Sequence, residues 1–114
     1  MAATYRWTAD QGATWNTVFT YAIDGTPVDI TGYTARMQVR STVDATSTIA
    51  SFTTTGGTIV LGGSAGTITM NVTATATAAI AAGSYVYDLE IVSGAGVVTR
   101  LLQGPFVVSA EVTR

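Results

Sequence analysis

Apolar and polar side chains alternate strictly along two segments of the chain, residues 33–40 and 84–92. In each segment the apolar and aromatic side chains share one face; they are Tyr33, Ala35, Met37 and Val39 in the first and Tyr85, Tyr87, Leu89 and Ile91 in the second. A period of two residues is typical of a β-strand with one buried and one solvated face. Both segments are therefore predicted to be half-buried strands.

Shorter runs with the same character fill most of the remaining chain. The predicted strands are residues 4–8, 14–22, 49–53, 58–61, 67–72 and 97–108. Asp24-Gly25 and the glycine-rich run 62–66 indicate tight turns, and the alanine-rich stretch 73–82 is long enough for one or two helical turns only. Many short strands without a stable helix favour a β-sandwich or small barrel.

The residues around Tyr85 favour one type of sandwich. Tyr85 enters a strand directly after the alanine-rich corner, two positions before Tyr87, which the alternation places inside. Immunoglobulin-like domains carry a tyrosine in this position, the tyrosine corner. We therefore expect an all-β, immunoglobulin-like β-sandwich of about 7–9 short antiparallel strands, forming one domain over residues 1–114.

The composition excludes several classes of function. Charged residues make up 11% of the 114 residues, against about 25% in ordinary soluble proteins, and the chain has no histidine and no cysteine. Lysine is absent too, so most nucleophile–base pairs and nitrogen- or thiolate-ligated metal sites are not available. We expect no enzyme activity, no cofactor and no bound metal. Scarce charge on a soluble chain instead points to surface that is covered by other subunits.

Other partners and locations are not supported by the sequence either. The arginines are scattered singly and the net charge is −2, which gives no basic stripe for nucleic acid. Every hydrophobic stretch is interrupted before it reaches the about 20 residues of a membrane helix. The first residues lack a secretory signal pattern, so synthesis in the cytoplasm is expected.

Asp88 and Glu90 are the best candidates for carboxylate chemistry, because alternation places them on one strand face. Such a pair can act as acid and base or hold a hard cation. If strands 33–40 and 84–92 are neighbours, however, Arg36 and Arg40 project on the same outer face. We therefore predict cross-strand ion pairs, each contributing about 0.2–1 kcal/mol.

Aromatic residues gather near the N-terminus, where Tyr5, Trp7 and Trp15 are the main members. Three roles are open for them: core packing, an anchor for a neighbouring subunit, and a platform that stacks on sugar rings. As an interface, they would work with a projecting N-terminal arm formed by residues 1–13. Arg6 and Arg114, close to the chain ends, are candidate contacts to acidic neighbours.

Three stretches together carry a resemblance to a known family: GTPVDITGYTARMQVR (residues 25–40), AGSYVYDLE (82–90) and GVVTRLLQGPFVVS (96–109). With the opening aromatic strand, and with Gly66 and Ile68 between them, they resemble small virion proteins of tailed phages and prophages. The organisation is similar to the N-terminal immunoglobulin-like domain of phage upper baseplate proteins. The shared motifs are glycine turns and alternating strands, so the resemblance brings no catalytic residue with it.

The resemblance implies a non-enzymatic structural protein of the virion. We expect a repeated subunit of the tail or baseplate adsorption apparatus, made in the cytoplasm of the bacterial host and built into the particle. Its partners would be copies of itself and baseplate, tail or major capsid proteins. Two alternatives stay open: a decoration protein on the phage head, and a module that binds a host glycan through the N-terminal aromatics.

Overall fold

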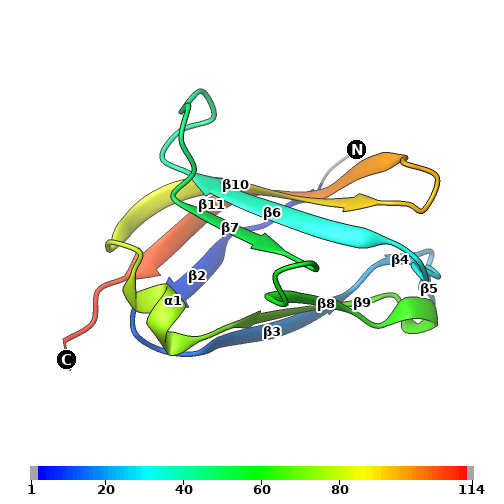
Figure 1. Cartoon of the computed structure of the whole chain (residues 1–114), viewed down its shortest axis with the longest axis horizontal. Coiled ribbons are helices and arrows are strands. Elements are labelled where there is room, and N and C mark those ends of the chain that lie inside the picture. The colour runs from blue at the N-terminus through cyan, green and yellow to red at the C-terminus, as the bar shows by residue number, and fades with distance from the viewer. Residues whose placement is uncertain (1–2, 113–114) are drawn as a thin grey trace.

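Two facing β-sheets make up the protein, which a computed structural model describes over residues 3–112 (Figure 1). The larger one, sheet A, has the order β1-β11-β10-β6-β7, with β2 also paired to β11. Its strands are β1 (Ala3–Thr4), β2 (Trp7–Asp10), β6 (Thr34–Arg40), β7 (Ala50–Thr53), β10 (Gly83–Val92) and β11 (Val98–Ser109). The two strands with the clearest alternation in the sequence, β6 and β10, are direct neighbours and run antiparallel, as the sequence predicted.

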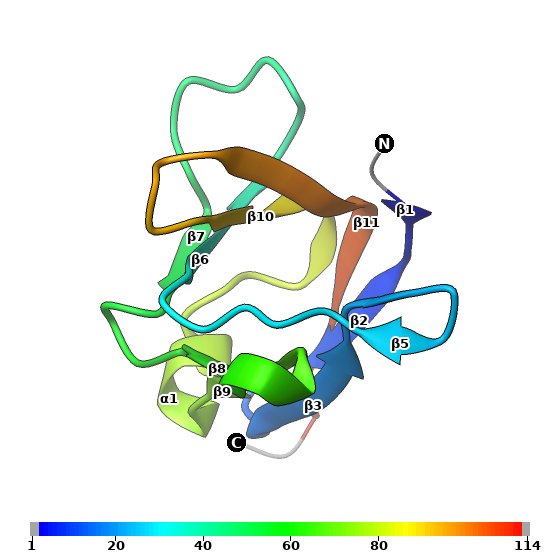
Figure 2. The ribbon, with the colours of Figure 1, turned by 90° about the vertical axis from the view of Figure 1, so that its right-hand side faces the viewer.

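The second layer, sheet B, has the order β3-β9-β8. It comprises β3 (Trp15–Thr20), β8 (Ile59–Leu61) and β9 (Thr67–Val72). A small hairpin of β4 (Ala22–Ile23) and β5 (Thr26–Pro27) lies in the connection between the sheets, and two short helices complete the chain, η1 (Gly63–Ala65) and α1 (Ala74–Ala78). Figure 2 shows the loop after β6 rising from the outer side of sheet A, away from sheet B.

The strand order confirms an immunoglobulin-like β-sandwich. Such folds place the second, fourth and fifth strands in one sheet and the third, sixth and seventh in the other. Here β3, β8 and β9 form the first group, and β6, β10 and β11 form the second. Within residues 3–112, eight strands are three residues or longer, namely β2, β3 and β6 to β11. One detail of the prediction is wrong: β1 and β2 pair with β11 in parallel, so the sandwich is not purely antiparallel.

Turn chemistry in the connection from β3 to β6 follows the sequence. Asp24 and Gly25 both have positive φ, 51° and 80°, and they close the β4–β5 hairpin as a two-residue turn. Further on, the Thr31 side-chain hydroxyl and backbone N–H both donate to Asp29 Oδ1, at 2.6 and 2.9 Å. These two bonds, the side-chain bond first, lower the pKa of Asp29. The connection is therefore a shaped segment that leads into β6.

The core lies between the sheets and is rich in aromatic rings. Its fully buried members include Met37, Met70, Leu89 and Phe106, contributed by both layers. Trp7 and Trp15 contact each other at its centre, and the ring centroid of Trp15 lies 5.3 Å from Trp7, 5.3 Å from Phe106 and 5.9 Å from Phe52. Edge-to-face contacts of this kind add to the hydrophobic gain from burial. The aromatics of the N-terminal third therefore hold the two sheets together.

The corner between β9 and β10 closes one end of the sandwich, and two features of it were expected from the sequence. Thr73 caps α1, accepting a hydrogen bond from the Ala76 N–H at 3.2 Å, so the alanine-rich stretch does form a single short helix. The Tyr85 hydroxyl donates to the Ala81 carbonyl at 2.5 Å, which is the contact that defines a tyrosine corner. A third feature was not expected: the buried Thr77 hydroxyl donates to the Ala13 carbonyl at 2.8 Å and so ties this corner to the chain before β3.

Residues 3–12 do not form a projecting arm, contrary to one expectation from the sequence. Instead, β1 and β2 run along β11, with Thr4 opposite Gln103 and Trp7 opposite Phe106. Trp7 is 7% exposed and Trp15 is 9% exposed, so both side chains belong to the core. Their burial contradicts the prediction that they contact a neighbouring subunit: Trp7 stacks on Tyr87 and makes an edge-to-face contact with Trp15.

Tyr87 is expected to make the stability of the fold depend on alkaline pH. Its ring is 5% exposed, and its hydroxyl donates to the Tyr5 carbonyl at 2.7 Å. Burial, with the charge of Tyr5 as a second cause, raises the pKa of Tyr87 well above the ordinary value of 10.0. Above pH 10 the unfolded chain loses this proton while the folded chain keeps it, so the free energy of unfolding should fall by about 1.4 kcal/mol per pH unit.

The measurement is urea unfolding of the wild type and of Tyr87→Phe between about pH 9 and pH 11. The phenylalanine variant keeps the ring but has no proton to lose at this site, so its stability should fall less steeply across the range. Equal slopes for the two proteins would contradict a coupling of folding to the protonation of Tyr87.

Candidate functional site

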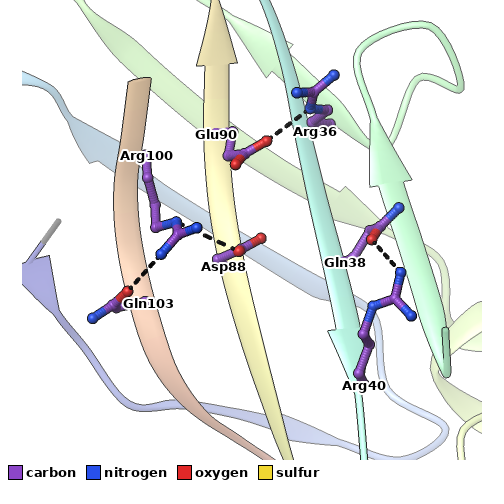
Figure 3. A network of polar contacts seen from close by, with 7 residues as sticks. All are labelled: Arg36, Gln38, Arg40, Asp88, Glu90, Arg100 and Gln103. Atoms are coloured by element: carbon purple, nitrogen blue, oxygen red, sulfur yellow. Dashed lines mark hydrogen bonds and ion pairs between the residues drawn. The ribbon is translucent and has the colours of Figure 1, made fainter. Parts of the chain in front are cut away.

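Five of the eleven charged residues in the described part of the chain gather on the outer face of sheet A (Figure 3). The strands β6, β10 and β11 present their outward side chains there in rows that cross the sheet. One row runs Gln38, Asp88, Gln103, and the adjacent row runs Arg36, Glu90, Arg100. On the other side of Asp88, Arg40 lies opposite Val86. Three guanidinium groups, two carboxylates and two amides therefore share one surface.

Of the two arginines predicted to form cross-strand ion pairs with Asp88 and Glu90, Arg36 does so and Arg40 does not. Arg36 Nε lies 2.9 Å from Glu90 Oε1, across the β6–β10 pairing. Arg40, in contrast, pairs with neither carboxylate, so the prediction is wrong for this residue. Its Nη1 donates to the Ala45 carbonyl at 2.8 Å, and its Nη2 donates to Gln38 Oε1 at 3.0 Å. The loop after β6 provides this carbonyl, so Arg40 is turned toward the loop.

Asp88 has a different partner, Arg100, at 3.6 Å between Oδ2 and Nε. A β-bulge brings the two together: Leu89 pairs with Leu102, but Glu90 pairs with Arg100, which leaves Leu101 as the extra residue. Strict alternation from Gln103 would turn Arg100 inward. The bulge turns Arg100 outward instead. Arg100 could not be found from the sequence, because alternation in residues 97–108 is weak and gives no sign of the extra position.

A groove of about 510 Å³ opens on this face, between the loop after β6 and the first strand. Its polar lining includes Gln38, Arg40, Asp88, Arg100 and Gln103. Apolar lining comes from Val86 and Pro105 on the sheet and from Val43 in the loop, whose side chain is exposed. The volume lies within the range of small-molecule sites in proteins, about 300–1,000 Å³. Size and mixed lining make this groove the candidate binding site of the protein.

The hydrogen bonds in the groove leave it with a surplus of donors. Arg40 Nη2 donates to Gln38 Oε1, and Arg100 Nη1 donates to Gln103 Oε1 at 3.3 Å. Because an arginine side chain can only donate, each glutamine must direct its oxygen to the guanidinium and turn its NH₂ group away. Each guanidinium also has further N–H groups beyond those used here. The groove is thus equipped for a ligand that accepts hydrogen bonds.

Sheet B presents the opposite kind of surface, without charge. Its outward residues are threonines, asparagines and valines: Asn16, Val18, Thr20, Val60, Thr67, Thr69 and Asn71. Val18 and Val60 flank Thr69 directly across the sheet and are 56% and 50% exposed. The strand β3, at one side of this sheet, has β9 as its single strand neighbour within residues 3–112. Sheet B therefore exposes an uncharged face that ends in an open edge.

The remaining candidates from the sequence are dispersed. Tyr5 is 53% exposed and Arg6 is exposed, both in the short break between β1 and β2. Arg114 lies outside the described residues. Within those residues, no three histidine, cysteine or acidic side chains come together as a metal site would need, and no helix has the length and hydrophobicity to cross a membrane.

Comparison with protein-family models and with curated proteins finds no match for the sequence. Among solved structures, the chain is similar to CopC from Methylosinus trichosporium OB3b, with 12% sequence identity and a TM-score of 0.49. The similarity covers 95% of this chain and 89% of the other. At this level of similarity no property of CopC carries over, so the function has to be argued from the surfaces described above.

Proposed function

We propose that this protein is a non-enzymatic structural subunit of a bacteriophage virion, part of the tail or baseplate adsorption apparatus, and that it acts through contacts with copies of itself and with other virion proteins. The proposal joins the resemblance of residues 25–40, 82–90 and 96–109 to phage baseplate domains with the uncharged surface of sheet B. A location on the phage head, as a decoration protein, is the alternative for the same surface chemistry.

The single observation that carries the proposal is the open edge of β3. The Tyr21 N–H donates to the Gly66 carbonyl at the end of the β3–β9 ladder, and backbone directions alternate from there along the strand. The N–H and C=O groups of Asn16, Val18 and Thr20 therefore point away from β9, toward the open edge. Monomeric proteins usually protect such an edge with lysine, proline or a bulge, but residues 15–20 contain no lysine or proline and pair with β9 in a regular register.

An open, uncharged edge suits a protein that is built into a larger assembly. A strand from a neighbouring subunit can pair with β3 and extend sheet B through main-chain hydrogen bonds. The half-buried Thr17 and Phe19, at the margin of the core, would then be covered further. The low charge of the chain fits this use, since no charged side chain on β3 has to be desolvated.

The edge predicts the behaviour of the purified protein. The wild type should associate as its concentration rises, and Val18→Lys should shift association to concentrations at least about tenfold higher, because a lysine at the edge must be desolvated or face another charge. Sedimentation velocity over a concentration series measures the shift. Val97→Lys is the matched control, because Val97 is 62% exposed in the β10–β11 turn, away from sheet B.

Two results would contradict this role of β3: a wild type that stays monomeric at high concentration, and association that is equally strong in Val18→Lys. Location in the virion is tested separately, by electron microscopy of intact particles labelled with an antibody to the protein. Label on the tail or baseplate supports the proposal, label on the head supports the decoration alternative, and particles without label overturn both.

A further inference from the structure

We propose that the groove on the outer face of sheet A binds an acidic sugar, a hydroxylated ring that carries a carboxylate. This goes beyond the proposed structural function and uses the opposite surface of the sandwich, with residues other than the N-terminal aromatics. The groove is lined by side chains from β6, β10 and β11 and walled by the loop after β6. Its volume of about 510 Å³ gives a small saccharide enough room.

Charge in the groove favours an anion. Arg100 is balanced by Asp88, and Arg36, outside the groove, is balanced by Glu90. Arg40 hydrogen-bonds only neutral groups, the Ala45 carbonyl and the Gln38 amide. The groove therefore has a formal charge of one positive unit, located at Arg40. A guanidinium can bind a carboxylate through two parallel N–H bonds, which makes Arg40 the expected contact for the acidic group.

Hydroxyl groups fit the remaining polar atoms. The amide NH₂ groups of Gln38 and Gln103 are free to donate, since each amide oxygen faces a guanidinium. Asp88 lies between these two glutamines in the same row, 40% exposed in its side chain, and its carboxylate can accept from a sugar hydroxyl. A sugar hydroxyl both donates and accepts, so a polyhydroxylated ring can use both kinds of group at once.

Apolar side chains in the groove suit the apolar face of a sugar ring. Val86 and Pro105 are opposite each other on β10 and β11 and line the groove next to the polar row. Val43, in the loop, lines the groove from a second side and is 83% exposed. The C–H face of a sugar ring can lie against such side chains while its hydroxyls and carboxylate face the polar row. A simple inorganic anion would leave these apolar contacts unused.

The test is a titration of the full chain with glucuronate, followed by two-dimensional amide NMR. We expect saturable shifts concentrated in β6, β10, β11 and residues 41–49. Glucose, which lacks the carboxylate, and acetate, which lacks the ring, should each bind at least about tenfold more weakly, since each loses one set of contacts. Acetate that binds as well as glucuronate would overturn the assignment to a sugar, leaving a general anion site.

Variants locate the binding. Arg40→Gln should weaken glucuronate binding by about tenfold or more, because the hydrogen bonds to the carboxylate lose their charge. Arg36→Gln is the matched control: it removes the same charge from the same face and the same strand, but Arg36 does not line the groove. Equal weakening in the two variants, or no saturable shifts in the wild type, would overturn the proposal. Association through β3 is measured independently, so failure here leaves the structural function standing.

Discussion

Replacing Trp15 with alanine is expected to lower the free energy of unfolding by about 3–5 kcal/mol. The side chain is 9% exposed and makes edge-to-face contacts with Trp7, Phe52 and Phe106, which come from three different strands. Alanine would leave a large cavity between the sheets, and rigid rings around it cannot collapse to fill the space. Because domains of this size are stable by about 5–15 kcal/mol, the variant should keep only part of its stability.

Urea unfolding at neutral pH, followed by circular dichroism, measures this loss. Tyr5→Ala is the control, since Tyr5 is 53% exposed and its backbone contacts with Gln103 and Tyr87 do not depend on its side chain. We expect a change of about 1 kcal/mol or less for that variant. If Trp15→Ala were as stable as the wild type but lost association with other subunits, the tryptophan would be an interface residue after all, and its place in the core would be contradicted.

The β-sandwich could be predicted because the patterns that indicate it lie within short segments of the sequence. Alternation in residues 33–40 and 84–92 specified two strands and their inner faces, and the structure buries Met37, Val39, Leu89 and Ile91 as expected. Tyr85 after an alanine-rich corner favoured the immunoglobulin-like type, because a tyrosine in this position is characteristic of such domains, and its hydroxyl does donate to the Ala81 carbonyl. Periodicity and a single corner motif were enough to define the fold class.

The role of the N-terminal aromatics could not be predicted, since it depends on pairing between distant segments. Trp7 is buried because β2 runs parallel to β11, about 100 residues later in the chain. Nothing in residues 1–13 specifies which strand they join, or whether they join one at all. An exposed arm and a paired strand have the same composition, and only the partner strand distinguishes them.

The candidate groove could be predicted from the sequence only in part, because it too depends on contacts between distant segments. Alternation placed Arg36, Arg40, Asp88 and Glu90 on one outer face, and one of the predicted pairs, Arg36–Glu90, forms. The bulge at Leu101 brings in Arg100, and the loop carbonyl of Ala45 takes Arg40 away from Asp88. A one-residue irregularity and a loop conformation therefore decide which guanidinium is neutralised and which one is left for a ligand.

Gly66 combines a local turn with a long-range contact. The glycine-rich run 62–66 was predicted as a turn, and Gly66 does have a positive φ of 69° at the end of η1. What the sequence did not reveal is its surroundings. A Cβ on Gly66 would lie 2.8 Å from the carbonyl oxygens of both Tyr21 and Val28, and the Tyr21 oxygen also accepts a hydrogen bond from the Val28 N–H.

Gly66→Ala is therefore expected to destabilise the protein by about 3 kcal/mol, from a strained backbone and from a clash with two main-chain carbonyl oxygens. Gly57→Ala separates the two causes. Gly57 has a similar φ of 81°, but a Cβ there would meet nothing within 4 Å, so its loss should be only about 1 kcal/mol. Urea unfolding of both variants gives the difference. Equal losses would mean that backbone conformation alone requires glycine at position 66, and that the close approach between the β8–β9 turn and the end of β3 contributes nothing to the stability of the sandwich.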